Sequence, residues 1–418
     1  MTQNNFGNVL HVQGERTGGA AGAVLLERSA AAFEAALRVR TETASPVEWA
    51  RTQNNLGNVL ATQGERTGGA AGAALLERSA AAFEAALRVR TEAASPVEWA
   101  ATQNNLGIVL RIQGERTGGA TGAALLDRSA AAFEAALRVY TETASPVQWA
   151  TTQNNFGIVL EVQGERTGGA TGAALLDRSV AAFEAALQVY TETAGPVQWA
   201  MTQNDLGVVL QVQGERTGGA AGAALLERSV AAFEAALRVY TETASPVQWA
   251  STQTNLGAVL EVQGERTGGA AGAALLERSV AAFEAALRVY TETASPVQWA
   301  STQTNLGAVL EVQGERTGGA AGAALLDRSV AAYEAALQVY TTASPVDWAR
   351  TQANLGNVLR VQGERTGGAA GVALLERSAA AYEAALRVFS EAGATRYAEI
   401  VKQKLEAVTT LLHQRSAP

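Results

Sequence analysis

The chain has 418 residues, of which 47% are hydrophobic and 17% charged, a balance that is ordinary for a globular protein. Its net charge of −8 argues against nucleic acid as a partner, because phosphate binding requires clustered positive charge. There is no cysteine, which excludes disulfides, thiolate nucleophiles and cysteine metal sites. No apolar run is long enough to span a membrane and the N-terminus is unlike a secretion leader, so we expect a cytoplasmic protein with no membrane contact.

The sequence repeats itself about every 50 residues. The motif Gly-Glu-Arg-Thr-Gly-Gly occurs eight times, first at Gly14 and last at Gly363. A tryptophan marks the start of every unit after the first: Trp49, Trp99, Trp149, Trp199, Trp249, Trp299 and Trp348. These spacings predict eight tandem repeats over residues 1–393, followed by a segment at 394–418 that is too short for a second domain. A fixed period of this kind is typical of a solenoid, in which each unit buries its apolar face against its neighbours.

The first repeat begins inside its first helix. Met1 is followed directly by Thr-Gln-Asn, without the Ser-Pro start and the tryptophan of later units. We therefore expect Phe6, Val9 and Leu10 to be partly bare, and an exposed apolar patch usually marks an interaction site. This predicts a weak homodimer through the N-terminal repeat, with a monomer whose first helix is frayed as the alternative.

Each later repeat begins with a predicted helix, as the third copy illustrates. Ser95 suits the N-cap, Pro96 suits the first helical position, and Glu98 would complete a capping box. One helical face then carries Trp99, Gln103, Leu106, Leu110 and Gln113. We expect Gly114 to end this helix.

A second helix follows in the same repeat. Gly118, Gly119 and Gly122 predict a loop, and the helix is expected to begin near Ala123 and fade near Thr143. Its apolar face carries Leu126, Ala130, Phe133, Leu137 and Tyr140. No segment alternates with a period of two, so the sequence predicts an all-α fold of antiparallel helix pairs.

The sequence offers little for catalysis. The Gly64-Glu-Arg-Thr-Gly-Gly segment lacks the Gly-Lys-Ser/Thr ending of a phosphate loop, so we interpret it as a tight connection whose Glu and Arg pair within or between repeats. An anion held by the amides that follow it remains the alternative. Ser79 lies beside Glu77, but the only histidines are His11 and His413, so no base accompanies it. We expect no enzyme activity, no cofactor and no metal.

The segment at 394–418 departs from the repeat. Val401, Leu405, Val408 and Leu412 form an apolar stripe at helical spacing. The residues between them are largely polar. A terminal helix of this kind would seal the last apolar face of a solenoid, so we predict a C-terminal capping helix.

The repeat resembles a known family. Asn55-Leu56-Gly57-Asn58 followed by Gln63-Gly64-Glu65 is similar to the first-helix core of the tetratricopeptide (TPR) repeat, and Phe83-Glu-Ala-Ala-Leu is similar to the end of its second helix. This unit is longer than the usual 34 residues, and Ser79 stands where the family prefers Ala. The resemblance implies a right-handed α-solenoid that binds a protein or peptide in its concave groove. The 50-residue variant resembles bacterial arrays that lie beside signalling or effector domains.

The copies differ mainly along one stripe of the first helix, at steps of 3, 4 and 3 residues. In the TPR family the matching face lines the ligand groove, whereas a solvent-facing stripe that merely drifts is the alternative. The candidate binding residues on this stripe are Arg51, Asn54, Asn58, Asn104, Ile108, Arg111, Asn154, Ile158, Glu161, Asn204, Val208, Gln211, Glu261, Glu311, Arg350, Asn357 and Arg360.

The chemistry of the stripe predicts the partner. Ile108, Ile158 and Val208 favour an apolar segment, and the glutamates beyond them favour Lys or Arg on its flanks. We therefore predict a non-enzymatic scaffold that binds a protein or peptide with basic flanks around an apolar core. The alternatives are a building block that self-assembles head to tail or N-end to N-end, and a sensor array for a separately encoded effector.

Overall fold

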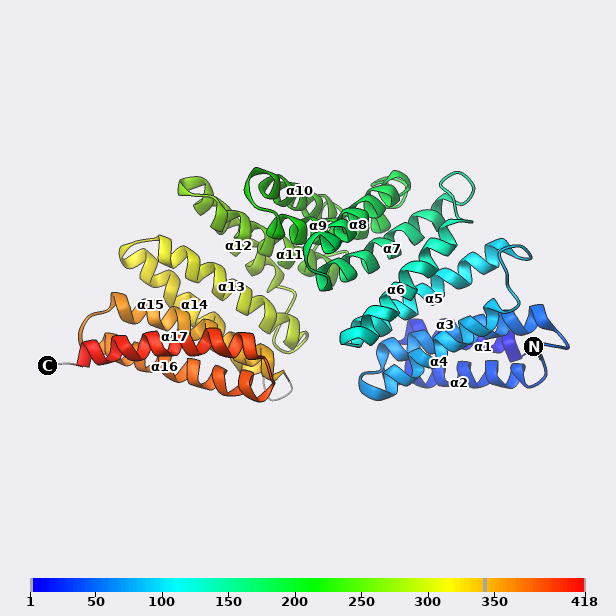
Figure 1. The fold of residues 1–418 in the computed structure, drawn as a ribbon, viewed down its shortest axis with the longest axis horizontal. Coiled ribbons are helices and arrows are strands. Elements are labelled where there is room, and N and C mark those ends of the chain that lie inside the picture. Colours follow the sequence, from blue (N-terminus) through cyan, green and yellow to red (C-terminus); the bar gives the residue numbers. More distant parts are fainter. Residues whose placement is uncertain (1–2, 341–343, 417–418) are drawn as a thin grey trace. The chain divides into compact units, whose positions relative to one another are not determined.

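The computed structural model describes residues 3–340 and 344–416, which form α-helices and no strands (Figure 1). The first helices of the eight repeats are α1 (Gln3–Thr17), α3 (Pro46–Arg66), α5 (Pro96–Arg116), α7 (Pro146–Arg166), α9 (Pro196–Arg216), α11 (Pro246–Arg266), α13 (Pro296–Arg316) and α15 (Pro345–Arg365). The second helices are α2 (Gly19–Leu37), α4 (Gly69–Leu87), α6 (Gly119–Leu137), α8 (Gly169–Val189), α10 (Gly219–Leu237), α12 (Gly269–Ala286), α14 (Gly319–Val339) and α16 (Gly368–Glu391). The last helix is α17 (Thr395–Ser416).

The chain divides into two compact units, Met1–Gln213 and Gly214–Pro418. Within the units, the first helix packs against the second helix of its own repeat in the pairs α1–α2, α3–α4, α5–α6, α7–α8, α11–α12, α13–α14 and α15–α16. The second helix of one repeat also packs against the first helix of the next, as α2 does on α3 and α10 on α11. Both units are therefore α-solenoids of stacked helical hairpins, as the sequence predicts. None of the described helices is long and apolar enough to cross a membrane.

The predicted end of the first helix is wrong. Gly114 lies inside α5, which continues to Arg116. A Cβ atom on Gly114 would lie 2.8 Å from Leu126 Cγ, and one on Gly107 would lie 2.8 Å from the ring of Phe133. The glycines are therefore positions where the two helices of a hairpin approach closely, and they do not terminate the helix.

The second helix also differs from its prediction. It begins at Gly119, four residues before Ala123, and in this repeat ends at Leu137, well before Thr143. Gly119 adopts φ +63°, which favours glycine, and a Cβ on Gly122 would lie 1.9 Å from the Thr117 carbonyl oxygen. The glycines predicted to form a loop instead allow the chain to turn and resume a helix within two residues.

The first helices start where the sequence predicts, but without a capping box. Ser95 is the N-cap residue of α5 and Pro96 occupies its first turn, yet the Ser95 side chain makes no capping hydrogen bond. The start is held instead by the backbone, because the Trp99 amide donates to the Ser95 carbonyl at 2.8 Å.

The core lies at the contacts between repeats. Leu126 and Phe133 of α6 pack against Phe156, Val159 and Leu160 of α7 in one cluster. Trp99 is 8% exposed and packs between Leu87 of the preceding repeat and the alanines of its own α6. Tyr140 is buried in the same cluster, and its hydroxyl donates to the Val97 carbonyl at 3.2 Å. The tyrosine at this position is therefore part of the core.

The first repeat exposes only part of the patch expected from its sequence. Phe6 and Val9 are 38% and 46% exposed, whereas Leu10 is 3% exposed and belongs to the core. The expectation that Leu10 would be partly bare is therefore wrong.

The arginine of the repeated motif joins successive repeats. Arg66 does not pair with a glutamate carboxylate as predicted, because its guanidinium donates to the carbonyls of Gly14 and Glu15 at 3.0 and 3.1 Å. These carbonyls end the first helix of the preceding repeat, where partners within the helix are lacking and a cation is favoured. The same contact recurs for Arg116, Arg166, Arg266, Arg316, Arg365 and Arg415.

The helix α17 keeps this register. Arg415 donates to the carbonyls of Gly363, Glu364 and Thr366, just as Arg365 caps α13 one repeat earlier. Val401 and Val408 are buried against α16. The segment that departs from the repeat in sequence therefore takes the position of a ninth first helix.

Candidate functional site

The candidate stripe lies on the first helices of both units. Most of its side chains are half-buried, whereas Arg51 and Arg350 are exposed and Asn154 is buried. In the first unit the stripe runs from Arg51 to Gln211, and in the second from Glu261 to Arg360. The half-buried positions are partly exposed to solvent and lie at the edge of the core.

The asparagines of the stripe hold neighbouring repeats together. Asn54 Oδ1 accepts a hydrogen bond of 3.1 Å from the Thr102 hydroxyl of the next repeat. The same contact joins Asn104 to Thr152 at 3.2 Å and Asn154 to Thr202 at 2.8 Å. The threonines are buried. These amides therefore have a structural role between first helices, in addition to any contact with a ligand.

The arginines of the stripe are paired within their own helices. Arg51 pairs with Glu48, and Arg350 pairs with Asp347 at 3.0 Å. One step further along the stripe, Arg111 pairs with Glu115 and Arg360 pairs with Glu364. Their positive charges are therefore partly neutralised before any partner arrives.

The apolar side chains of the stripe belong to the first unit. Ile108, Ile158 and Val208 are half-buried at the same position of successive repeats. Ile108 also packs against the cluster that contains Phe133 and Phe156. In the second unit the equivalent positions are Ala258 and Ala308, so an apolar partner segment has more to contact on the first unit.

The glutamates of the stripe carry raised pKa values. Burial, reinforced by Glu165 and Asp205, raises the pKa of Glu161 to about 8 although Arg111 opposes the shift. Burial and the carboxylates of Glu265, Glu311 and Glu215 raise the pKa of Glu261 to about 8. At neutral pH a substantial fraction of both groups is therefore protonated.

Glu311 is held at a lower pKa than Glu261. Burial and the Glu315 carboxylate raise the pKa of Glu311 to about 7, whereas Tyr333, Lys404 and Arg360 lower it. The Tyr333 hydroxyl donates to Glu311 Oε2 at 3.2 Å. Lys404 of α17 donates to Asn357 Oδ1 at 2.8 Å, so the last helix supplies a cation to the same face.

Sequence reasoning missed Tyr333, Tyr382 and Lys404. Tyr333 and Tyr382 replace the phenylalanine of the first six repeats and are fully buried, yet their hydroxyls reach Glu311 and Asn357 on the stripe. The sequence feature that could have indicated this role is the change from Phe to Tyr, which occurs only in the last two copies. Lys404 could not be assigned to this face because α17 had no recognised register with the repeat.

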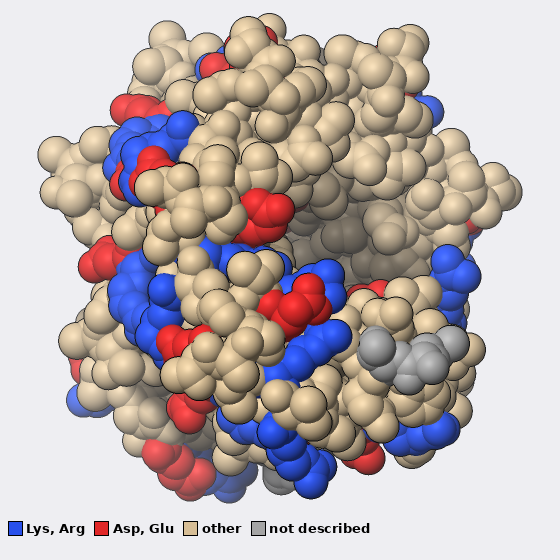
Figure 2. Space-filling model, turned by 90° about the vertical axis from the view of Figure 1, so that its right-hand side faces the viewer, with Lys and Arg blue, Asp and Glu red and all other residues tan. Residues whose placement is uncertain are grey.

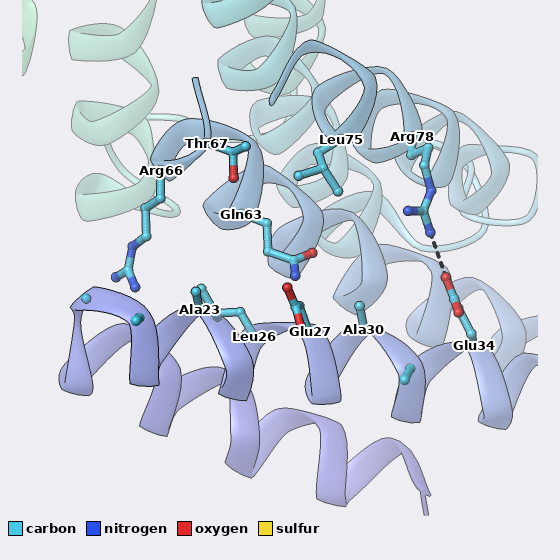
Figure 3. Close-up of a pocket in the computed structure, with 13 residues that line it drawn as sticks. Ala23, Leu26, Glu27, Ala30, Glu34, Gln63, Arg66, Thr67, Leu75 and Arg78 are labelled. Carbon is cyan, nitrogen blue, oxygen red and sulfur yellow. Dashed lines mark hydrogen bonds and ion pairs between the residues drawn. The ribbon is translucent and has the colours of Figure 1, made fainter. Parts of the chain in front are cut away.

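Outside the stripe, the second helix of the first repeat and the two helices of the next repeat line a hollow. A pocket of about 740 Å³ is lined by Leu26 and Glu27 of α2 and by Gln63, Arg66 and Arg78 from the next repeat (Figure 3). Figure 3 shows Gln63 pointing toward Glu27, while Arg78 pairs with Glu34 at 2.6 Å. A similar pocket recurs in the second unit, lined by Leu226, Glu227, Gln263, Arg266 and Arg278. The recurrence indicates that these pockets are a consequence of repeat packing.

Ser79, the serine that the sequence places beside Glu77, has a structural role. Ser79 is buried and its hydroxyl donates to the Gly57 carbonyl at 2.7 Å, which explains a serine where the TPR family prefers alanine. No group of three or more metal-ligating side chains occurs in the described part of the chain. Figure 2 shows one face of the molecule, on which Lys and Arg lie next to Asp and Glu and the remaining surface is largely uncharged.

No family model matches the sequence, and no curated protein matches it either. Three solved structures illustrate the likeness in fold. The C-terminal part of a TPR repeat-containing protein from Cytophaga hutchinsonii has a TM-score of 0.45 at 9% identity, covering 79% of this chain and 93% of that one. A Rap protein complexed with Competence and Sporulation Factor has a TM-score of 0.43 at 9% identity, covering 99% and 98%. BtubC from P. vanneervenii has a TM-score of 0.42 at 15% identity, covering 67% and 92%.

The helices of this chain form an α-solenoid of hairpins with a repeat of about 50 residues, which resembles TPR arrays. The similarities are in fold alone, so the function is argued from the residues of the stripe.

Proposed function

We propose that the first-helix stripe binds a protein or peptide that has basic side chains around an apolar segment. The observation that carries this proposal is the set of half-buried glutamates, Glu161, Glu261 and Glu311, whose ionised forms are disfavoured in the free protein. The charged groups that act on Glu261 are all carboxylates. A lysine or arginine of a partner would therefore relieve both the burial of charge and the repulsion between carboxylates.

The apolar part of the partner would contact the first unit. Glu161 follows Ile158 by one step of three residues on α7, so an apolar segment and a basic flank can be bound next to each other. The arginines of the stripe repel a basic partner less than unpaired arginines would, because each is paired with a carboxylate of its own helix.

Binding of a basic partner should be coupled to proton release. The glutamates must ionise to pair with a cation, and their pKa values of about 7 to 8 place this step near neutrality. We therefore expect affinity to rise between about pH 6 and pH 8, and to fall with added salt because exposed charges are screened beyond about 8 Å at physiological ionic strength.

A peptide with a short apolar core between two pairs of lysines provides a direct test. Its affinity for the intact protein is measured at low salt, at pH 6 and at pH 8, and compared with the variant Glu161→Gln/Glu261→Gln/Glu311→Gln. We expect the variant to bind several-fold more weakly at pH 8 and to lose most of the pH dependence, because each lost pair is worth about 0.2–1 kcal/mol.

The matched control replaces three exposed glutamates of second helices, Glu77→Gln/Glu227→Gln/Glu277→Gln, which removes the same number of carboxyl groups. We expect this control to bind like the unaltered protein. Equal weakening in both variants would mean that only net charge matters, and an unchanged affinity of the stripe variant at low salt would contradict the proposal.

A further inference from the structure

In the second, third and sixth repeats, an arginine at the end of the second helix lies over the tryptophan of its own repeat. The guanidinium of Arg88 is 5.1 Å from the ring centroid of Trp49, and it donates to the two carboxylate oxygens of Glu42 at 3.0 and 2.8 Å. An aromatic face and a carboxylate thus hold one guanidinium. The same arrangement recurs for Arg138 with Trp99 and Glu92, and for Arg288 with Trp249 and Glu242.

Two other repeats have the tryptophan and the carboxylate without the arginine. Gln188 stands at the arginine position in the fourth repeat, and Gln338 stands there in the seventh. The Gln188 amide donates to the Glu184 carbonyl of its own helix at 3.3 Å. The glutamates that match the paired ones are Glu142 and Glu292, which are exposed and make no hydrogen bond or ion pair with the described residues.

The turn that carries the glutamate is the same with and without the arginine. Around Glu142, the amides of Ala144 and Ser145 donate to the hydroxyl and the carbonyl of Thr141 at 3.1 and 3.0 Å. The corresponding bonds around Glu92 are also 3.1 and 3.0 Å long. In the seventh repeat they are 3.1 and 2.9 Å long. The backbone therefore places each unpaired carboxylate as it places a paired one.

The tryptophans of these two repeats are also more accessible. Trp99 and Trp249, which lie under arginines, are 8% and 9% exposed, whereas Trp149 and Trp299 are half-buried. An arginine stem covers apolar surface that the shorter glutamine leaves open. The fourth and seventh repeats therefore each present a ring face and a carboxylate to solvent.

We propose that Trp149 with Glu142 forms a site for the guanidinium of an arginine side chain from a partner polypeptide. Trp299 with Glu292 forms a second site of the same kind. The arginines of this chain define the ligand, because they occupy the matching place in other repeats through the indole face and a paired hydrogen bond to the carboxylate. A lysine ammonium matches the charge but lacks the planar fork of donors.

This pair of sites is separate from the first-helix stripe. Trp149 precedes Ile158 by nine residues, which is about two and a half helical turns, so the two side chains lie on opposite sides of α7. Each site is formed within one repeat. A partner can therefore use it whether or not it also contacts the stripe.

The test uses the intact protein with isotope-labelled indole nitrogens, and N-acetyl-arginine N-methylamide as the probe. Titration at constant ionic strength should shift the indole signals of Trp149 and Trp299 along saturable curves. An exposed ion pair with one cation–π contact should give a Kd on the order of 10–100 mM. Trp149→Phe and Trp299→Phe assign the two signals. Their failure to shift at about 100 mM probe would overturn the proposal.

Three further probes define the ligand. The citrulline analogue has nearly the same shape without the charge and should cause no saturable shift. The lysine analogue should bind about threefold or more weakly, because it cannot form the paired hydrogen bond. Equal binding of either analogue would overturn the assignment to a guanidinium. Free arginine that binds at least about tenfold more tightly than the blocked form would identify the amino acid itself as the ligand and overturn the assignment to a polypeptide.

A variant that fills the sites is the first control. Gln188→Arg/Gln338→Arg supplies the guanidinium from the chain itself and should weaken binding of the probe at Trp149 and Trp299 at least about fivefold. Unchanged binding in this variant would overturn the proposal.

A variant that opens matching sites is the second control. Arg88→Gln/Arg288→Gln removes the arginines of the second and sixth repeats, and the indole signals of Trp49 and Trp249 should then titrate with the probe as well. The dispersion of the other indole signals shows that the variant is folded. A folded variant in which neither tryptophan responds would overturn the proposal, because the ring and the carboxylate would then be insufficient to form the site.

Discussion

The last helix and the first repeat differ in whether their matching side chains are buried. At the C-terminal end, α17 lies where a ninth first helix would lie, its Val408 is fully buried and its Arg415 caps the carbonyls at the end of α15. At the N-terminal end, Val9 is 46% exposed and Arg16 has no acceptor among the described residues. One end thus completes the interface that every repeat makes, and the other presents half of it.

The comparison shows how much the burial of a repeated residue depends on the neighbouring repeat. Val408 and Val9 are the same residue type on matching helices, yet only Val408 is buried. A repeat therefore acquires much of its stability from its neighbour, as expected for a solenoid in which contacts run only between adjacent units.

The largest expected difference between the two ends concerns these valines. Val408→Asp would bury a carboxylate without a partner and should cost about 3 kcal/mol or more. Val9→Asp should change the stability by no more than about 0.5 kcal/mol, because the side chain is already in water. Urea denaturation measures both, and hydrogen exchange locates the loss in α16 and α17. Equal costs would mean that the ends are alike.

The second difference concerns the capping arginines. Arg415→Ala removes hydrogen bonds to three carbonyls at the end of a helix and should cost about 1 kcal/mol, or a fall of about 2–4 °C in melting temperature. Arg16→Ala should leave the melting temperature unchanged within error, since no bond is lost. A destabilising effect of Arg16→Ala would show that this side chain already has a partner in solution.

The smallest expected difference is in pH dependence, which has opposite signs near the two ends. Burial lowers the pKa of His11 below its usual 6.5, so its contribution to stability is present above that pH and lost as the pH falls. Burial raises the pKa of Glu311 from 4.5 to about 7, so its contribution is present below pH 4.5 and lost as the pH rises toward 7.

Melting curves between pH 4 and pH 8 distinguish the two groups. His11→Gln should flatten the curve on the acidic side of pH 6.5, and Glu311→Gln should flatten the decline between about pH 5 and pH 7. Lys404→Gln should extend that decline to higher pH, because Lys404 holds the pKa of Glu311 down. A decline that Glu311→Gln leaves intact would assign it to other groups.

Helix pairing and the positions of the first-helix starts were predictable from the sequence. The 50-residue period, Pro96 at the helix start and the spacing of Leu106, Phe133 and Leu137 all depend on local chemistry and on periodicity, which are present in the sequence itself. The helix ends were not predictable, because Gly114 and Gly119 are also the residues expected in a loop. Their role in close packing depends on Leu126 and on the turn that the two helices share.

The stripe of candidate residues was visible as variation between copies, whereas the roles of its members were not. Sequence alone placed Asn54, Arg111 and Glu261 on one helical face. Only the packing of neighbouring repeats gives Asn54 a threonine partner and surrounds Glu261 with carboxylates. The repeat itself was determined by the sequence because it depends on neighbouring positions in one chain. The helix-end contacts of Arg66 and Arg415 were decided by tertiary structure, because their acceptors lie about a whole repeat away in the sequence. The same holds for the effect of Glu215 and Glu311 on the pKa of Glu261.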